Sequence, residues 1–93
     1  MNPESPKLSA GLYLVATPIG NARDITLRAL DVLASADVLA AEDTRTLKRL
    51  MEIHGIALAG RRVIAYHDHS AAAVRDGLVA RIAEGASVAY ASE

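Results

Sequence analysis

Short apolar runs and longer stretches of helical periodicity alternate along the chain. The runs cover residues 12–16, 38–41, 63–66 and 87–91, and turn residues bound each of them, as expected of β-strands. In residues 26–34, 44–53 and 70–84, apolar residues recur every three or four positions, which is the spacing of a helix buried on one face. The regular order of strand and helix predicts an α/β domain, built as an open parallel sheet with helices on both faces.

The apolar positions also predict what each element buries. Leu12 to Ala16 is apolar throughout, which is typical of a strand buried on both faces of a parallel sheet. Each helix is expected to bury one stripe: Leu27, Leu30 and Leu33 or Ala34 in the first, Leu47, Leu50, Met51 and Ile53 in the second, and Ala71, Val74, Leu78 and Ile82 in the third.

Residues that cap or end a helix stand at the expected boundaries. Gly55 and Gly85 follow the second and third helices, where glycine adopts the left-handed conformation at little cost. The candidate N-caps are Asp24 or Thr26 for the first helix, Asp43 or Thr44 for the second, and Ser70 for the third.

Composition limits the chain to one small domain. The 93 residues include no cysteine, which excludes a disulfide framework, a thiolate zinc site and a thiol nucleophile, and fits a cytoplasmic protein. The net charge of -1 supplies no general attraction for nucleic acid, so an RNA partner would need a local basic patch. No apolar run approaches the roughly 20 residues of a membrane-spanning helix, so no membrane partner is expected.

The two ends of the chain differ from the rest. Residues 1–10 have no apolar core and are interpreted as a flexible arm, which leaves residues 11–93 as the domain. After the fourth predicted strand only Ser92 and Glu93 remain, with no helix to cover that strand. The pattern therefore predicts an incomplete domain.

Four loops follow the four predicted strands: residues 17–24, 42–45, 67–70 and 92–93. Because parallel strands deliver their carboxyl ends to one edge of a sheet, these loops are expected to meet there. Loops at such an edge are the first place to look for function.

The first of these loops contains Pro18, Ile19, Gly20 and Asn21. Its proline and glycine would let backbone groups approach a ligand closely, although a plain tight turn explains the same residues. The loop lacks the glycine spacing of a dinucleotide site and the Gly-Lys-Ser/Thr ending of a P-loop, so it is not a phosphate loop of either kind.

The second loop gathers charged side chains into the string Glu42, Asp43, Thr44 and Arg45. A carboxylate at the edge could take a proton from a substrate hydroxyl, whereas the structural alternative is a helix cap beside a solvated face. One helical turn further on, Lys48 and Arg49 join Arg45 in a basic patch suited to phosphate groups.

The third loop contains His67, Asp68 and His69. Two imidazoles are too few ligands for a metal site, and no third histidine or cysteine stands at a suitable spacing, so no metal is expected. A hydrogen-bonding role at the edge, or ordinary solvation, is the preferred interpretation.

Taken together, the strings Leu12 to Asn21, Asp24 to Leu30, Ala41 to Arg45 and Tyr66 to His69 resemble the ribosomal RNA small-subunit methyltransferase I family, within the tetrapyrrole methylase superfamily. The resemblance spans residues 11–93 in one register. It implies a cytoplasmic, homodimeric enzyme that uses S-adenosylmethionine to methylate the 2′-hydroxyl of a cytidine in small-subunit ribosomal RNA. It also implies a second, C-terminal α/β domain that these residues do not include, with the methyl donor in the cleft between the two domains.

The resemblance matches loop residues to the family's site, but it does not settle the individual roles of residues 42–45, which are inferred here from their chemistry. Pro18, Ile19, Gly20 and Asn21, with Ser92 and Glu93, match the loops that border the methyl donor. Glu42, Asp43, Thr44 and Arg45 match the family's most characteristic string. We expect Glu42 or Asp43 to act as the base and Arg45 to steer phosphate, and Thr44, Lys48, Arg49, His67 and His69 to contact the RNA.

Two other functions remain open at this point. A porphyrinoid methyltransferase shares the implied fold, although the first loop lacks the Gly-x-Gly-Pro-Gly-Asp pattern that such enzymes favour. A folded RNA-docking module without catalysis is the alternative from a different class, and these 93 residues are not expected to be active by themselves.

Overall fold

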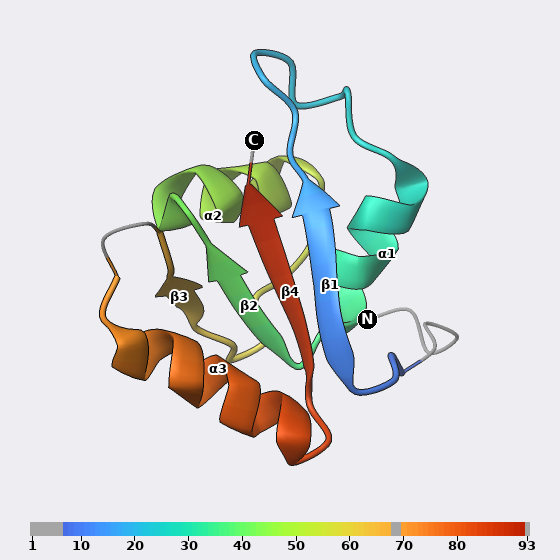
Figure 1. The fold of residues 1–93 in the computed structure, drawn as a ribbon. Helices are drawn as coiled ribbons and strands as arrows, with labels where there is room; N and C mark the ends of the chain where they lie inside the picture. The colour runs from blue at the N-terminus through green and yellow to red at the C-terminus, as the bar shows by residue number, and fades with distance from the viewer. Residues whose placement is uncertain (1–6, 68–69, 93) are drawn as a thin grey trace.

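A computed structural model describes residues 7–67 and 70–92 as a four-stranded parallel sheet with three helices (Figure 1). The strand order is β1-β4-β2-β3. The elements are β1 (Gly11–Ala16), α1 (Leu27–Ser35), β2 (Val38–Ala41), α2 (Thr44–Ile53), β3 (Val63–Ala65), α3 (Ala72–Ala83) and β4 (Ser87–Ser92).

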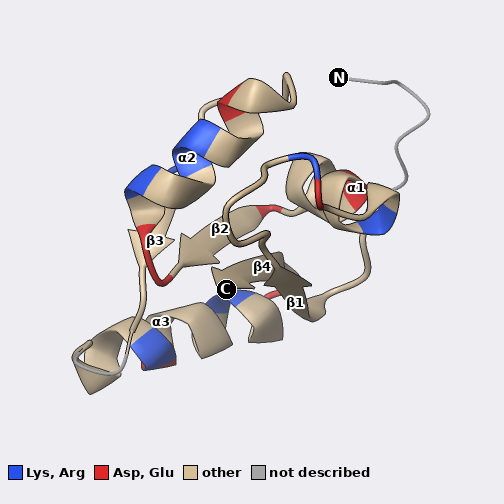
Figure 2. Ribbon diagram, turned by 90° about the horizontal axis from the view of Figure 1, so that it is seen from above, with Lys and Arg blue, Asp and Glu red and all other residues tan. Residues whose placement is uncertain are grey.

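The helices form a layer on each face of the sheet. From β1 to β2 to β3 the chain moves across the sheet in one direction, and from β3 to β4 it moves back. Right-handed crossovers therefore put α1 and α2 on one face and α3 on the other, as Figure 2 shows. The predicted open parallel sheet with helices on both faces is confirmed.

The main core lies between the sheet and the layer of α1 and α2. Alternate residues of the central strands point into it, while the helices contribute one stripe each. Its most deeply buried side chains include Leu33 of α1, Leu39 of β2, and Leu47 and Met51 of α2. This side of the domain follows the predicted apolar pattern closely.

The opposite face of β1 is uncovered. Leu12 and Leu14 are 57% and 77% exposed on this face, whereas Val15, on the face that meets the main core, is buried. The prediction that β1 is buried on both faces is wrong, because β1 is an edge strand and α3 packs beside β4 and β2 instead.

Parts of the predicted helix stripes are also wrong. Leu27, the first residue of α1, is 81% exposed, and Ile53, the last residue of α2, is 52% exposed. In α3, Val74, Leu78 and Ile82 are only half-buried and Ala71 is exposed. A layer made of one helix shields fewer side chains than the paired layer on the other face.

The helix boundaries test the predicted caps. Thr26 caps α1 by accepting a hydrogen bond from the Ala29 N–H at 3.0 Å, and Asp43 caps α2. Ser70 does not cap α3, because its Oγ accepts instead from the His67 N–H at 2.8 Å and the N-cap position falls on Ala71. Gly85 ends α3 with a φ of +102°, as predicted.

Candidate active site

The carboxyl ends of the strands are joined by backbone hydrogen bonds that reach past the sheet into the loops. The Thr17 N–H donates to the Ser92 carbonyl at 2.9 Å, and the Glu42 N–H donates to the Ala91 carbonyl at 3.2 Å. The loops after β1 and β2 are therefore both fixed to the end of β4. The predicted meeting of these loops at one edge is confirmed.

A small cleft of about 70 Å³ opens where these loops meet. Thr17, Glu42, Asp43 and Ser92 line its polar side, and Thr46, Leu47 and Ala91 complete it. The Glu42 side chain is exposed at this cleft, and its backbone is fixed by the bond to β4. Glu42 is thus an accessible carboxylate on a rigid support.

Asp43 is engaged in the structure of α2. Its Oδ1 accepts hydrogen bonds from the Thr46 N–H at 3.2 Å and the Arg45 N–H at 3.0 Å. The bond from Thr46 is the main cause that lowers the pKa of Asp43 below its ordinary value of 3.8. A carboxylate held in this way is a poorer proton acceptor, so the geometry separates the two candidate bases that the sequence left equal.

The basic patch lies on the exposed surface of α2. Arg45, Lys48 and Arg49 are all exposed, at the i, i+3 and i+4 spacing that puts them on one side of the helix. In Figure 2 blue Lys and Arg positions lie along α2, which covers the sheet from above. Thr44 begins α2 and is half-buried, which makes it less accessible than the patch.

The loop after β1 folds back on itself. Asn21 Oδ1 accepts from the Arg23 N–H at 2.9 Å, and the Asn21 carbonyl accepts from the Asp24 N–H at 3.0 Å, so Asn21 stabilises the turn. Gly20 has a φ of +89°, which favours glycine. Pro18, Gly20 and Arg49 line a groove of about 250 Å³ between this loop and α2, and Ile19 is exposed.

Another pocket at the same edge, here named the tyrosine pocket, has a volume of about 330 Å³. Tyr66, His67, Ser70, Arg75 and Tyr90 line it, together with Ala71 and Ala72. His67 was predicted to face the substrate, whereas both tyrosines and Arg75 were missed. The signal for Tyr90 was its place one residue before the end of a strand's apolar run. His69 and Glu93 lie outside the described residues.

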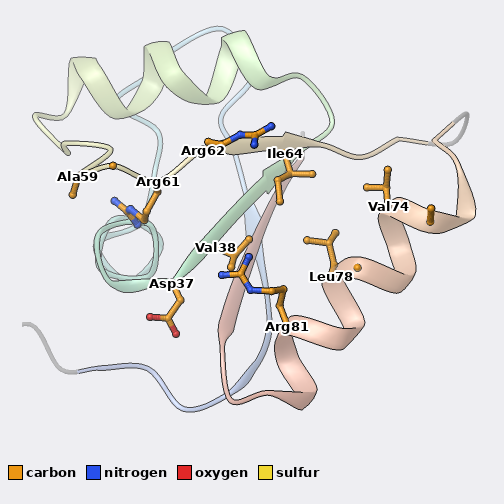
Figure 3. Close-up of a pocket in the computed structure, with 12 residues that line it drawn as sticks. Asp37, Val38, Ala59, Arg61, Arg62, Ile64, Val74, Leu78 and Arg81 are labelled. Atoms are coloured by element: carbon orange, nitrogen blue, oxygen red, sulfur yellow. The ribbon is translucent and has the colours of Figure 1, made fainter.

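A larger cavity, of about 690 Å³, lies at the opposite end of the strands, between α3 and the start of β2 and β3 (Figure 3). Its most heavily bonded side chain is Arg61, whose guanidinium donates to the carbonyls of Leu58 and Leu33 at 2.7 Å, Ala57 at 2.8 Å and Ala36 at 2.9 Å. Figure 3 shows Arg61 directed toward α1, away from Leu78 and Val74. Arg61 therefore holds the end of α1, and none of the predicted site residues lines this cavity.

None of the helices within residues 7–67 and 70–92 is long and apolar enough to cross a membrane.

Comparison with known proteins extends these observations. Residues 11–93 match the sequence pattern of the family described as tetrapyrrole (corrin/porphyrin) methylases. Three curated relatives are each named "Ribosomal RNA small subunit methyltransferase I". The protein from Mesorhizobium japonicum is 51% identical over 86 residues, which cover 92% of this chain and 28% of the relative.

The other two relatives match a similar part of the chain. The protein from Escherichia coli O157:H7 is 45% identical over 82 residues, covering 88% of this chain and 28% of the relative. The protein from Bacillus subtilis is 39% identical over 82 residues, covering 88% of this chain and 27% of the relative. The chain thus spans just over a quarter of the length of these proteins. Since the family pattern covers nearly all of the described sheet and helices, the chain belongs to the tetrapyrrole (corrin/porphyrin) methylase family.

Proposed function

We propose that this chain forms the donor-facing and RNA-facing α/β domain of an S-adenosylmethionine-dependent methyltransferase. Its substrate is the 2′-hydroxyl of a cytidine in small-subunit ribosomal RNA. The observation that carries this proposal is the hydrogen-bonded meeting of the loops after β1, β2 and β4 at one edge, with an exposed carboxylate among them. The names of the relatives support the coarser part of this proposal, methyl transfer to small-subunit ribosomal RNA.

The loops after β1 and β4 would hold the methyl donor. Gly20 supports this role, because it lines the groove between this loop and α2, where a residue without a side chain leaves the backbone accessible. Pro18, Ile19 and Asn21 would border the donor from the same loop, and Ser92, followed by Glu93, would border it from the end of β4. Ligand sites usually have a volume of about 300–1,000 Å³. The 70 Å³ cleft is too small to hold the donor by itself, so it would form only one wall of the donor site.

The basic surface of α2 would hold the RNA. Arg45 and Lys48 are exposed on α2 and would bind phosphate oxygens. Arg45 would donate two parallel hydrogen bonds to one phosphate, as a bidentate donor. Arg49 lines the groove beside the loop after β1, where the donor-binding and RNA-binding surfaces would meet. Thr44, His67 and His69 would add contacts from the neighbouring loops.

Glu42 would act as the base. When bound, S-adenosylmethionine supplies an electrophilic methyl group on its sulfonium, and the attacking ribose oxygen must lose its proton. Glu42 is exposed at the cleft and free to accept that proton, whereas Asp43 is engaged as the N-cap of α2 with a lowered pKa. Holding the reactants in line contributes roughly 7–11 kcal/mol to such a reaction, and a positioned base adds to this.

A hybrid enzyme tests this function. In the hybrid, residues 11–92 of this chain replace the matching segment of the Escherichia coli O157:H7 relative. We expect the hybrid to transfer a radiolabelled methyl group to the 2′-oxygen of one cytidine in small-subunit ribosomal RNA. Labelling of a porphyrinoid instead of RNA, or a folded hybrid without transfer to either, would overturn the proposal.

A further inference from the structure

The tyrosine pocket has aromatic walls at the edge where the substrate RNA would lie. The rings of Tyr66 and Tyr90 meet edge to face, with their centroids 5.9 Å apart and their planes at 74°. Both side chains are half-buried, so part of each stays accessible from the pocket. A pocket with aromatic walls suits a flat unsaturated ring, which gains dispersion energy by stacking.

Hydrogen bonds hold these walls in place before any ligand arrives. The Tyr90 hydroxyl donates to the Tyr66 carbonyl at 3.0 Å, which joins the end of β4 to the segment after β3. Two further bonds of 2.8 Å join His67 to Ser70 beside the pocket, from the His67 N–H to Ser70 Oγ and from the Ser70 N–H to the His67 carbonyl. The position of Tyr90 against Tyr66 is thus set before a ligand binds, which reduces the ordering entropy that binding would cost.

Positive charge stands beside the aromatic walls. Arg75, in the first turns of α3, lines the pocket, and within residues 7–67 and 70–92 it forms an exposed ion pair of 3.3 Å with the neighbouring Asp76. Such an exposed pair contributes little and can rearrange when an anion arrives. At the N-cap of α3, Ala71 has no side-chain acceptor, so the first-turn N–H groups also favour a negative group there.

We propose that the tyrosine pocket binds one nucleotide of the RNA, with the base against Tyr66 and Tyr90 and the phosphate beside Arg75. This inference rests on the proposed function and adds a subsite for a nucleotide that neighbours the methylated one. A flat wall and an adjacent cation, both facing a volume of about 330 Å³, are what a mononucleotide requires.

Titration of small probes into this chain tests the subsite without any methyl transfer. We expect cytidine 5′-monophosphate to bind at least tenfold more tightly than cytidine or ribose 5-phosphate, because only the nucleotide has both parts. Amide shifts in a ¹H–¹⁵N spectrum should concentrate at residues 66–67, 70–75 and 90. Equal affinity for the nucleotide and either fragment, or shifts centred elsewhere, would overturn the proposal.

Matched variants separate the two contributions. Tyr66→Leu should weaken nucleotide binding about tenfold through lost stacking, while Tyr66→Phe, which keeps the ring, should bind as the parent does. Arg75→Gln should abolish the preference for the nucleotide over cytidine. Arg62→Gln removes the same charge at the other end of the strands and should change nothing. Equal effects of Arg75→Gln and Arg62→Gln would contradict the subsite.

Failure of the nucleotide subsite can be distinguished from failure of the proposed methyl transfer. A hybrid that methylates RNA while this chain binds no nucleotide in the tyrosine pocket refutes the subsite alone. Nucleotide binding in the pocket, with a hybrid that transfers no methyl group, refutes the proposed reaction alone.

Discussion

The Nε2 atom of His54 lies 2.7 Å from the carbonyl oxygen of Ala22, although 32 positions separate the two residues. Since a carbonyl oxygen only accepts, the ring nitrogen donates. The bond ties the carboxyl end of α2 to the loop after β1. The His54 side chain therefore joins the helix that carries the basic patch to the loop that would border the methyl donor.

Replacing His54 should loosen that loop. We expect His54→Leu to lower the free energy of unfolding by about 1 kcal/mol, the usual net contribution of one hydrogen bond, and to speed amide exchange in residues 17–24. His54→Gln keeps a donor on a side chain of similar length and should restore part of the protection. Unchanged exchange in His54→Leu would show that the bond does not restrain the loop.

Arg61 is expected to dominate the stability of the opposite end of the sheet. Its guanidinium serves the carbonyls of Leu33, Ala36, Ala57 and Leu58, which lose a donor when it is removed. Arg61→Met should lower the free energy of unfolding in urea by about 2–4 kcal/mol. The matched variant Arg62→Met changes an exposed neighbour and should stay within about 0.5 kcal/mol of the parent. Equal losses in both variants would refute this role of Arg61.

Asp37 should make the free energy of unfolding depend on pH. The Ser87 N–H donates to Asp37 Oδ2 at 2.9 Å and the Ser87 hydroxyl donates to it at 3.1 Å; the backbone bond is the main cause that lowers the pKa of Asp37 below its ordinary value of 3.8. Because the folded state binds this proton less readily, the contribution is complete above about pH 4 and is lost as pH falls through the lowered pKa.

Two variants isolate this contribution. In urea denaturation at a series of pH values, Asp37→Asn should be less stable than the parent at neutral pH and should lose less stability below pH 3.8. Ser87→Ala removes the hydroxyl and keeps the backbone donor, so its pH dependence should be intermediate. Parallel profiles for the parent and Asp37→Asn would contradict the account.

The uncovered face of β1 predicts a contrast between adjacent residues. Leu14→Thr should change the free energy of unfolding by less than about 0.5 kcal/mol, because the side chain is already exposed. Val15→Ala should cost roughly 2 kcal/mol, because Val15 is buried in the core. Thermal or urea unfolding checks both. A larger loss for Leu14→Thr than for Val15→Ala would mean that α3 or another element covers Leu14.

The apolar pattern predicted the strands and helices of the described residues, because the strands are short apolar runs and the helices carry apolar residues every three or four positions. It could not predict the exposure of Leu14, since strand order decides which strand lies at an edge. The link from Asp37 to Ser87 spans 50 positions, and the bonds of Arg61 to α1 span 25 and 28, so neither leaves a local signal. Parallel topology alone predicted where Glu42 and Thr17 would meet.

Within the candidate site, the tyrosine pocket likewise depends on contacts between residues that are far apart in the sequence. His67 was identified from its place after a strand, as the loop rule suggests. The apolar pattern places Tyr66 and Tyr90 in strands and indicates no part for them in the site, because their contact depends on β3 and β4 ending at the same level on either side of β2. Residues whose importance arises from pairing across the sheet are the ones that a linear pattern misses.

The most direct test of the account compares Glu42→Gln with Asp43→Asn in the hybrid enzyme, by single-turnover methyl transfer. Because Glu42 would take the hydroxyl proton, Glu42→Gln should slow transfer by about 10²–10⁴-fold at saturating S-adenosylmethionine. Asn caps a helix as well as Asp does, so Asp43→Asn should transfer at nearly the parent rate. Full activity of Glu42→Gln would contradict the central claim that Glu42, whose backbone is bonded to the end of β4, accepts the proton during methyl transfer.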